Sequence, residues 1–189
     1  MNGTLKEVAK MNACYISVDV ETTGPTPGKY DMYELGACVV GKERLRFQTN
    51  IALPPVVRYE KDALRAVGID DIRVITSRTA PEPKEAMTKF GAWVAKVSAR
   101  TRPVFVANNA PFDWMFVAWY FGEFDVANPF GHSALDMKAY FMGLTGCPWK
   151  EATLANMAKY AGIAFEKLPH RALDDAIIQS RIARFILTP

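Results

Sequence analysis

Residues 14–24, CYISVDVETTG, decide the expected fold. Aromatic and β-branched side chains dominate residues 14–20, which favours a strand over a helix. Successive side chains of a strand point to opposite faces, so Asp19 and Glu21 project to the same side near its end. Two neighbouring carboxylates repel each other, and Mg²⁺ or Mn²⁺ prefers oxygen ligands of this kind. The pair therefore indicates either a metal site or a strand that enters solvent with two exposed acids.

Two further strands are expected in the first third of the chain. An apolar run at residues 33–40 is separated from residues 45–51 by Gly41 and a few charged residues, the pattern of an antiparallel hairpin. A short helix is expected at residues 59–67. A longer amphipathic helix follows the sequence TAPEP, because apolar residues recur there at three- and four-residue steps: Met87, Phe90, Trp93, Val94 and Val97.

Strands and helices alternate in the rest of the chain. Residues 103–107, PVFVA, indicate a buried strand, and Pro111 suits the first turn of a following helix, so Asp113 lies at a strand-to-helix junction. The remaining expected elements are a strand at 133–136 and helices at 137–142, 153–161 and 172–187. This order predicts an α/β fold with a mixed sheet and helices on both faces.

Length and composition suit one soluble domain. The chain has 189 residues and no repeat or dividing linker, so we expect an N-terminal extension at 1–12 and a single domain at 13–189. No run approaches the ~20 apolar residues of a membrane-spanning helix, which argues against a membrane partner. The three cysteines show no metal-binding spacing, so a reducing cytoplasm is expected. A net charge of +3 permits a polyanionic partner without demonstrating one.

Three short motifs follow one another: DVETTG at 19–24, NNAPFD at 108–113 and HRALDD at 170–175. Together they resemble the motifs of the DEDDh exonucleases, an RNase H-like family that includes polymerase proofreading subunits, oligoribonuclease and RNase T. Asp19 and Glu21 match the first motif, Asp113 closes the second, and His170 and Asp175 match the third. The resemblance runs from about residue 14 to 187 and includes the segments ELGA and ALRAVGI.

This resemblance implies an RNase H-like fold and a 3′→5′ exonuclease. It implies that Asp19 bridges two Mg²⁺ or Mn²⁺ ions, that Glu21 and Asp175 complete the first ion site, and that Asp113 supports the second through water. His170 would accept the proton of the attacking water. The substrate would be a single-stranded nucleic acid with a free 3′ end, and the product a nucleoside 5′-monophosphate.

Four further residues are expected to have roles other than direct catalysis, or roles that stay open. The family spacing selects Asp175 as the metal ligand, so Asp174 is expected to be a solvated helix residue. Asn109 matches a family asparagine and is expected to organise the site. Asp136 matches a recurring family acid whose role stays open. His132 is expected to be an ordinary packing or surface residue.

Four residues are candidates for substrate binding by the same resemblance. Thr22 and Thr23 belong to the segment that meets the terminal sugar in the family. Leu64 and Val67 are expected either to pack against the last bases or to fill the core. Basic residues of the same region could contact phosphates or form a solvated helix face: Arg58, Lys61 and Arg65.

Alternative functions stay open at this point. A proofreading subunit of a polymerase complex would use the same chemistry, whereas a non-catalytic binding module is disfavoured because every catalytic position is filled. An RNase H-type endonuclease is disfavoured because the His-x₄-Asp spacing belongs to the exonucleases. We expect a free-standing enzyme, and the sequence decides neither between DNA and RNA nor whether the chain forms a homodimer.

Overall fold

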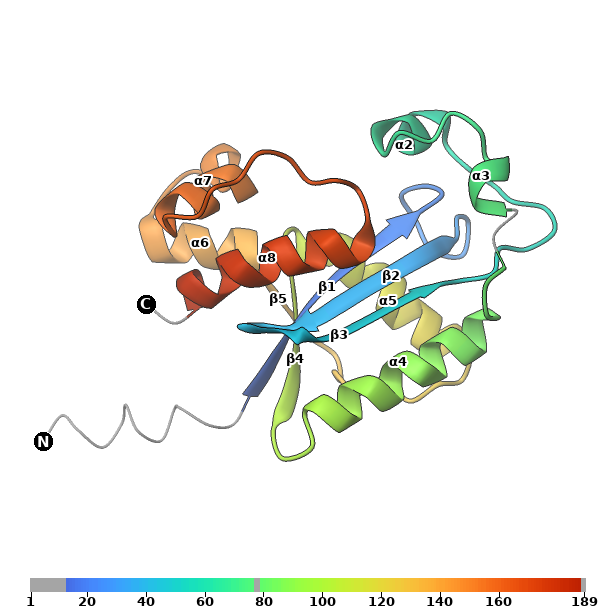
Figure 1. Cartoon of the computed structure of the whole chain (residues 1–189), viewed down its shortest axis with the longest axis horizontal. Coiled ribbons are helices and arrows are strands. Elements are labelled where there is room, and N and C mark those ends of the chain that lie inside the picture. The colour runs from blue at the N-terminus through green and yellow to red at the C-terminus, as the bar shows by residue number, and fades with distance from the viewer. Residues whose placement is uncertain (1–12, 77–78, 188–189) are drawn as a thin grey trace, which may run out of the picture.

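A computed structural model describes residues 13–76 and 79–187 (Figure 1). Its sheet has five strands in the order β3-β2-β1-β4-β5. They are β1 (Ala13–Thr22), β2 (Met32–Val39), β3 (Lys42–Asn50), β4 (Arg102–Ala107) and β5 (Ala134–Asp136). The pairs β1–β2 and β2–β3 are antiparallel, whereas β1–β4 and β4–β5 are parallel. The expected single domain on a mixed sheet is therefore confirmed.

Helices cover both faces of the sheet (Figure 1). One face carries α4 (Pro83–Val97) and α5 (Ala110–Glu123), and the other carries α6 (Met137–Thr145), α7 (Leu154–Tyr160) and α8 (Ala172–Leu187). Two short helices, α2 (Lys61–Ala66) and α3 (Arg73–Thr76), lie near the end of β1, and a 3-10 turn, η1 (Trp149–Glu151), precedes α7. None of the helices within the described ranges has the length and apolar character to span a bilayer.

The alternation of β1 creates both the core and the site. Ile16 and Val18 are fully buried in the core under α4 and α5, together with Phe90 and Phe116. Tyr15, on the other side of the strand, packs against the second core under α6, α7 and α8. Because faces alternate along a strand, the acids of β1 lie on the α8 side.

The register of β1 and β2 changes beside those acids. Asp19 lies opposite Gly36 and Glu21 lies opposite Glu34, but the register shifts between Glu21 and Thr22. An irregularity of this kind increases the local twist and redirects the side chains that follow it.

The predicted elements are confirmed with ends displaced by up to three residues. The helix expected at 172–187 is α8, and the strand expected at 45–51 is β3. Two elements were not predicted, α3 and η1, because four and three residues are too few for a periodic pattern. The expected extension at 1–12 lies outside the described residues.

Candidate active site

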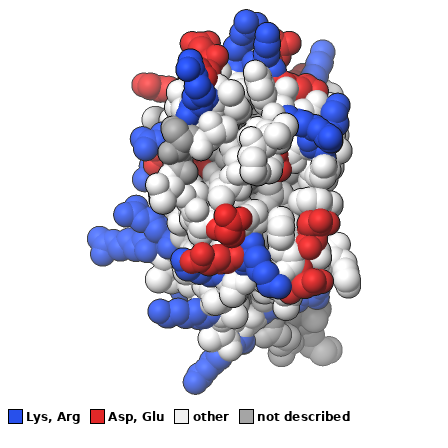
Figure 2. Space-filling view, turned by 90° about the vertical axis from the view of Figure 1, so that its right-hand side faces the viewer, with Lys and Arg blue, Asp and Glu red and all other residues white. Residues whose placement is uncertain are grey.

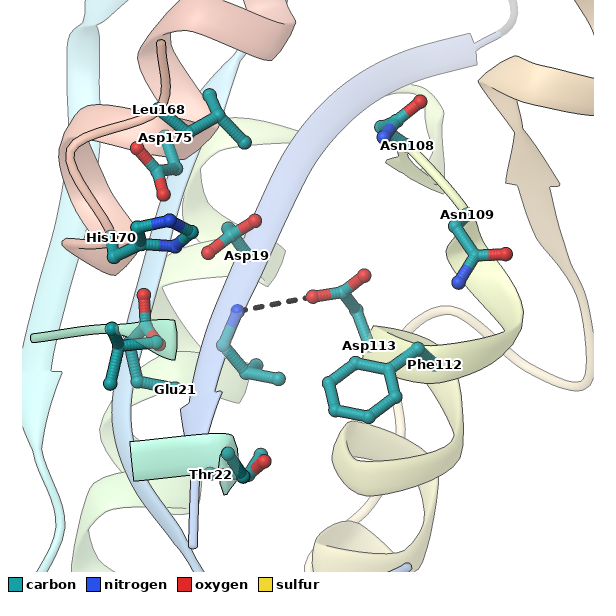
Figure 3. A pocket seen from close by; sticks show the side chains of 13 residues that line it. Asp19, Glu21, Thr22, Asn108, Asn109, Phe112, Asp113, Leu168, His170 and Asp175 are labelled. Carbon is teal, nitrogen blue, oxygen red and sulfur yellow. Dashed lines mark hydrogen bonds between the residues drawn. The ribbon is translucent and has the colours of Figure 1, made fainter. Parts of the chain in front are cut away.

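A cavity of about 260 Å³ lies at the carboxyl end of β1 (Figure 3). Its walls come from β1, α2, the turn between β4 and α5, and the start of α8. Eight predicted site residues line it: Asp19, Glu21, Thr22, Val67, Asn109, Asp113, His170 and Asp175. Residues more than 150 positions apart in the sequence therefore meet at one end of the sheet.

Strand β1 contributes two carboxylates to this cavity. Glu21 is only 6% exposed, and Asp19 is partly buried. Figure 3 shows the Asp19 carboxylate between Asp113 on one side and His170 and Asp175 on the other. The predicted same-side placement of the two β1 acids is confirmed, and Asp19 occupies the central position.

Helix α5 contributes Asp113 from its first turns. This side chain is 5% exposed, and its Oδ1 accepts a hydrogen bond of 3.1 Å from the backbone N–H of Val20 (Figure 3). The bond joins α5 to β1 directly beside Asp19. The distance between these two acids is therefore fixed by the packing of the helix on the sheet.

Helix α8 and the loop before it contribute Asp175 and His170. One ligand atom each from Glu21, His170 and Asp175 lie within 4.8 Å of one another. His170 has a positive φ of 56°, an uncommon conformation for a residue with a Cβ. Within residues 13–76 and 79–187, no hydrogen-bond partner reaches the buried Asp175 Oδ1. A cation ligand is one physical explanation for such an unsatisfied oxygen.

The two adjacent acids of α8 have different surroundings. Asp174 is exposed, does not line the cavity, and has its Oδ2 3.7 Å from the Nε of Arg171. Asp175 is 2% exposed and lines the cavity. The geometry thus supports the register that the His-x₄-Asp spacing indicated.

Burial is the main cause of the raised pKa values of the four site carboxylates. Burial, and then repulsion from the other acids of the site, raises the pKa of Asp19 well above its ordinary range. Burial and repulsion from Asp175 raise the pKa of Glu21 to about 8. Burial likewise raises the pKa of Asp113 to about 8 and that of Asp175 to about 6. Without a neutralising cation, the ionised cluster is therefore unfavourable at neutral pH.

Two of the predicted substrate residues do not line the cavity. Thr23 is fully buried, and its hydroxyl accepts a hydrogen bond of 2.9 Å from the N–H of Asp31. Leu64 is 2% exposed and packs with Tyr33 and Ile75. Of the two possibilities for Leu64, this structure favours core packing, and the Thr23 hydroxyl binds the backbone of the loop after β1.

Residues around the second motif organise the turn between β4 and α5. Asn109 lines the cavity in a left-handed conformation, with φ 62° and ψ 47°, which asparagine tolerates better than most residues. The role of Asp136, left open above, is a capping one. Its side chain accepts hydrogen bonds from the N–H groups of Ala110, Lys138 and Ala139, and so joins the starts of α5 and α6.

Sequence reasoning missed other residues of the site. Phe112 and Leu168 line the cavity, and Gln179 binds Asp19 from α8. A signal for Gln179 was present, because it is a polar residue one helical turn after Asp175 on the same face of α8. Phe112 and Leu168 looked like ordinary core residues in the sequence.

Figure 2 shows the side of the molecule on which α2 and α3 lie. Basic and acidic side chains occur together at its upper edge and again just below its centre, and the area between these two groups is mostly uncharged. Two basic residues of this region form ion pairs with acidic neighbours. The Nη1 of Arg65 lies 3.7 Å from the Oδ1 of Asp62, and the Nη2 of Arg73 lies 2.5 Å from the Oδ2 of Asp71. A continuous basic surface is therefore not visible on this face.

Comparisons with known proteins agree with this geometry. The RNase_T family model, described as "Exonuclease", matches residues 16–182. The 3′-5′ DNA exonuclease Cap18 of Escherichia coli is 32% identical over 179 residues, which cover 91% of this chain and 90% of that protein.

Two solved structures share the fold. The nuclease domain of 3′hExo, a DEDDh family member bound to rAMP, has a TM-score of 0.71 at 17% identity, over 93% of this chain and 90% of that one. Exonuclease I of Escherichia coli in complex with a dT13 oligonucleotide has a TM-score of 0.65 at 17% identity, over 94% of this chain and 41% of that one. The chain therefore belongs to the RNase_T exonuclease family and is a 3′→5′ exonuclease.

Proposed function

We propose that the enzyme uses two Mg²⁺ or Mn²⁺ ions, held by Asp19, Glu21, Asp113 and Asp175, to remove nucleotides from the 3′ end of single-stranded DNA. The products are nucleoside 5′-monophosphates. The observation that carries this proposal is the convergence of four carboxylates from three separate elements on one cavity. Hard divalent cations prefer such oxygen ligands, and they remove the repulsion that the cluster otherwise suffers.

The residues present fit such ions. The Oδ1 of Asp175 is buried without a hydrogen-bond partner in the described part of the chain, and one ligand atom each from Asp175, Glu21 and His170 lie within 4.8 Å of one another. Asp19 lies centrally and would hold the ions together with Asp113, which approaches from the side opposite His170 and Asp175 (Figure 3). When bound, a pair of ions supplies charge stabilisation for both the attacking and the leaving oxygen of the phosphodiester.

His170 supplies the base in this proposal. Its imidazole lies beside Glu21 and Asp175 at the wall of the cavity, where an attacking water would have to lie. A ring nitrogen that accepts the water's proton increases nucleophilicity at the moment of attack. The left-handed backbone at His170 places this ring at the end of the loop, immediately before α8 begins.

The terminal nucleoside would lie between α2 and α5. Val67 borders the cavity on the α2 side and Phe112 on the α5 side, and Thr22 and Asn109 add polar groups. Apolar and aromatic walls accept any base, because every base has an apolar face. This arrangement supports removal of the terminal nucleotide without sequence preference.

DNA is favoured over RNA by the relative that is matched along nearly its full length, because that protein is a DNA exonuclease. The alignment covers 90% of that protein, so little of the relative lies outside the region shared with this chain. Exonuclease I, which shares the fold, was solved with a single-stranded dT13 oligonucleotide, and this supports a single-stranded substrate.

A comparison of three substrates of one sequence tests this proposal: single-stranded DNA, duplex DNA and single-stranded RNA. We expect single-stranded DNA to be degraded fastest, and a 3′-phosphate to block degradation. Faster degradation of RNA would contradict the proposed substrate. Tight binding of all three without turnover would instead support the non-catalytic alternative.

A further inference from the structure

Gln179 of α8 makes two hydrogen bonds of opposite direction beside the site. Its Nε2 donates to Asp19 Oδ1 at 2.6 Å, and its Oε1 accepts from the backbone N–H of Asn108 at 2.8 Å. The side chain is 1% exposed. A buried amide with both ends occupied has one favourable orientation, because rotation by 180° would place its oxygen against a carboxylate.

These two hydrogen bonds connect the three elements that carry the four acids, namely β1, α5 and α8. Gln179 stands one turn after Asp175 on α8, Asp19 belongs to β1, and Asn108 begins the turn from β4 into α5, the helix of Asp113. Within residues 13–76 and 79–187, Gln179 is the only residue with a described hydrogen bond to the Asp19 side chain. The amide thus relates the central carboxylate to the elements on either side of it.

We propose that Gln179 is a positioning residue for the metal centre, which fixes the orientation of the Asp19 carboxylate and holds the turn at Asn108. This inference rests on the proposed function, in which Asp19 would help to hold the two ions. One oxygen of Asp19 is bound by the amide, so rotation of the carboxylate is restricted before any cation arrives. Partners that orient a ligand in this way typically change metal affinity or activity by ~10- to 100-fold when they are removed.

A purely structural role would give a different result. Gln179 lies beside Ser180, which is also fully buried. The Ser180 hydroxyl accepts a hydrogen bond from the N–H of Gly41 and donates one to the carboxylate of Glu43. Both residues contribute hydrogen bonds to the packing of α8, but only Gln179 contacts a carboxylate of the site. Ser180→Ala is therefore a matched control for the loss of buried hydrogen bonds in this helix.

The test uses Gln179→Met, which keeps the length of the side chain and removes both hydrogen bonds. Mn²⁺ binding is measured without substrate from the electron paramagnetic resonance signal of free Mn²⁺, alongside thermal unfolding and the values of kcat and KM. We expect Gln179→Met to bind Mn²⁺ ~10- to 100-fold more weakly and to lose kcat with little change in KM. Ser180→Ala should lower the unfolding temperature and leave Mn²⁺ affinity unchanged.

Equal Mn²⁺ affinity in Gln179→Met and the unchanged protein would overturn the inference. If Gln179→Met fails to fold, Gln179→Asn serves instead, because its shorter amide cannot reach both partners, and the same weakening is expected. Failure of the proposed function would be distinct, since the unchanged protein would then bind no Mn²⁺ at all.

Discussion

Gly36 of β2 lies directly opposite Asp19 of β1, and both face the start of α8. A Cβ at Gly36 would overlap backbone atoms of Ala172 and Leu173. The missing side chain therefore lets the first turn of α8 approach the sheet closely. That approach brings Asp175 within reach of the two acids of β1.

Replacement of Gly36 tests this relationship. Gly36→Ala should push α8 away from β2, destabilise the fold by about 1–3 kcal/mol, and reduce turnover more than the loss of stability explains. Gly122→Ala is the control, because a Cβ there meets nothing within 4 Å and alanine favours a helix. Thermal unfolding temperatures and kcat are measured for both variants. A normal kcat in folded Gly36→Ala would show that the close approach of α8 at Gly36 does not position Asp175.

The two adjacent acids of α8 should differ sharply in function. Asp175→Asn should lose most turnover, because a neutral amide is a poorer ligand for a divalent cation and leaves the charge of the site incomplete. Asp174→Asn should keep nearly full activity, since this exposed carboxylate is outside the cavity. Steady-state rates decide, and an inactive Asp174→Asn beside an active Asp175→Asn would show that the register is wrong.

The thermal stability of the protein should depend on both pH and Mg²⁺. The pKa of Glu21 is raised from 4.5 to about 8, so the folded, metal-free protein holds this proton more tightly than the unfolded chain. Protonated Glu21 therefore adds to the free energy of unfolding. This contribution is fully present below pH 4.5 and is lost as pH rises through about 8. At about 1.4 kcal/mol per pKa unit, the loss is on the order of a few kcal/mol.

Thermal unfolding of the metal-free protein should therefore show a falling Tm between pH 5 and pH 8. Added Mg²⁺ should raise Tm more at pH 8 than at pH 5, because protons compete with the cation for the same oxygens at low pH. Glu21→Gln should weaken the pH dependence of Tm in the metal-free protein. A Tm that is independent of both pH and Mg²⁺ would contradict the raised pKa values.

The two histidines provide another contrast. His170→Ala should lower kcat by ~10²–10⁴, the typical cost of losing a general base, while the protein stays folded. His132→Ala should be close to wild type, because His132 is exposed and does not line the cavity. Single-turnover rates measure this difference, and full activity in His170→Ala would remove the proposed base.

Substitutions of Leu64 and Val67 should distinguish a residue of the core from a residue that contacts substrate. Leu64→Ala should destabilise the protein by about 2–5 kcal/mol, since the side chain is 2% exposed. Val67→Ala should raise KM with little effect on stability, because Val67 lines the cavity and is only partly buried. The opposite pattern, a stable Leu64→Ala with a raised KM, would restore Leu64 as a substrate contact.

Local sequence patterns predicted the sheet and the main helices, and the family resemblance predicted eight of the thirteen residues that line the cavity. Alternation placed Asp19 and Glu21 on one face, and the His-x₄-Asp spacing separated Asp175 from Asp174. Contacts between distant segments could not be predicted in this way. The hydrogen bond between Gln179 and Asp19 joins residues 160 positions apart, and the burial of Leu64 depends on Tyr33 of β2.

The four-carboxylate site should remove nucleotides from a 3′ end only when a divalent metal ion is present. The most direct measurement follows a 5′-labelled single-stranded DNA oligonucleotide with time, in Mg²⁺ and in excess EDTA. The predicted result is a ladder of products that shorten one nucleotide at a time in Mg²⁺ and are absent in EDTA or with Asp175→Asn. Full activity in EDTA, or cleavage of a circular single strand at the same rate, would show that the enzyme is not a metal-dependent 3′→5′ exonuclease.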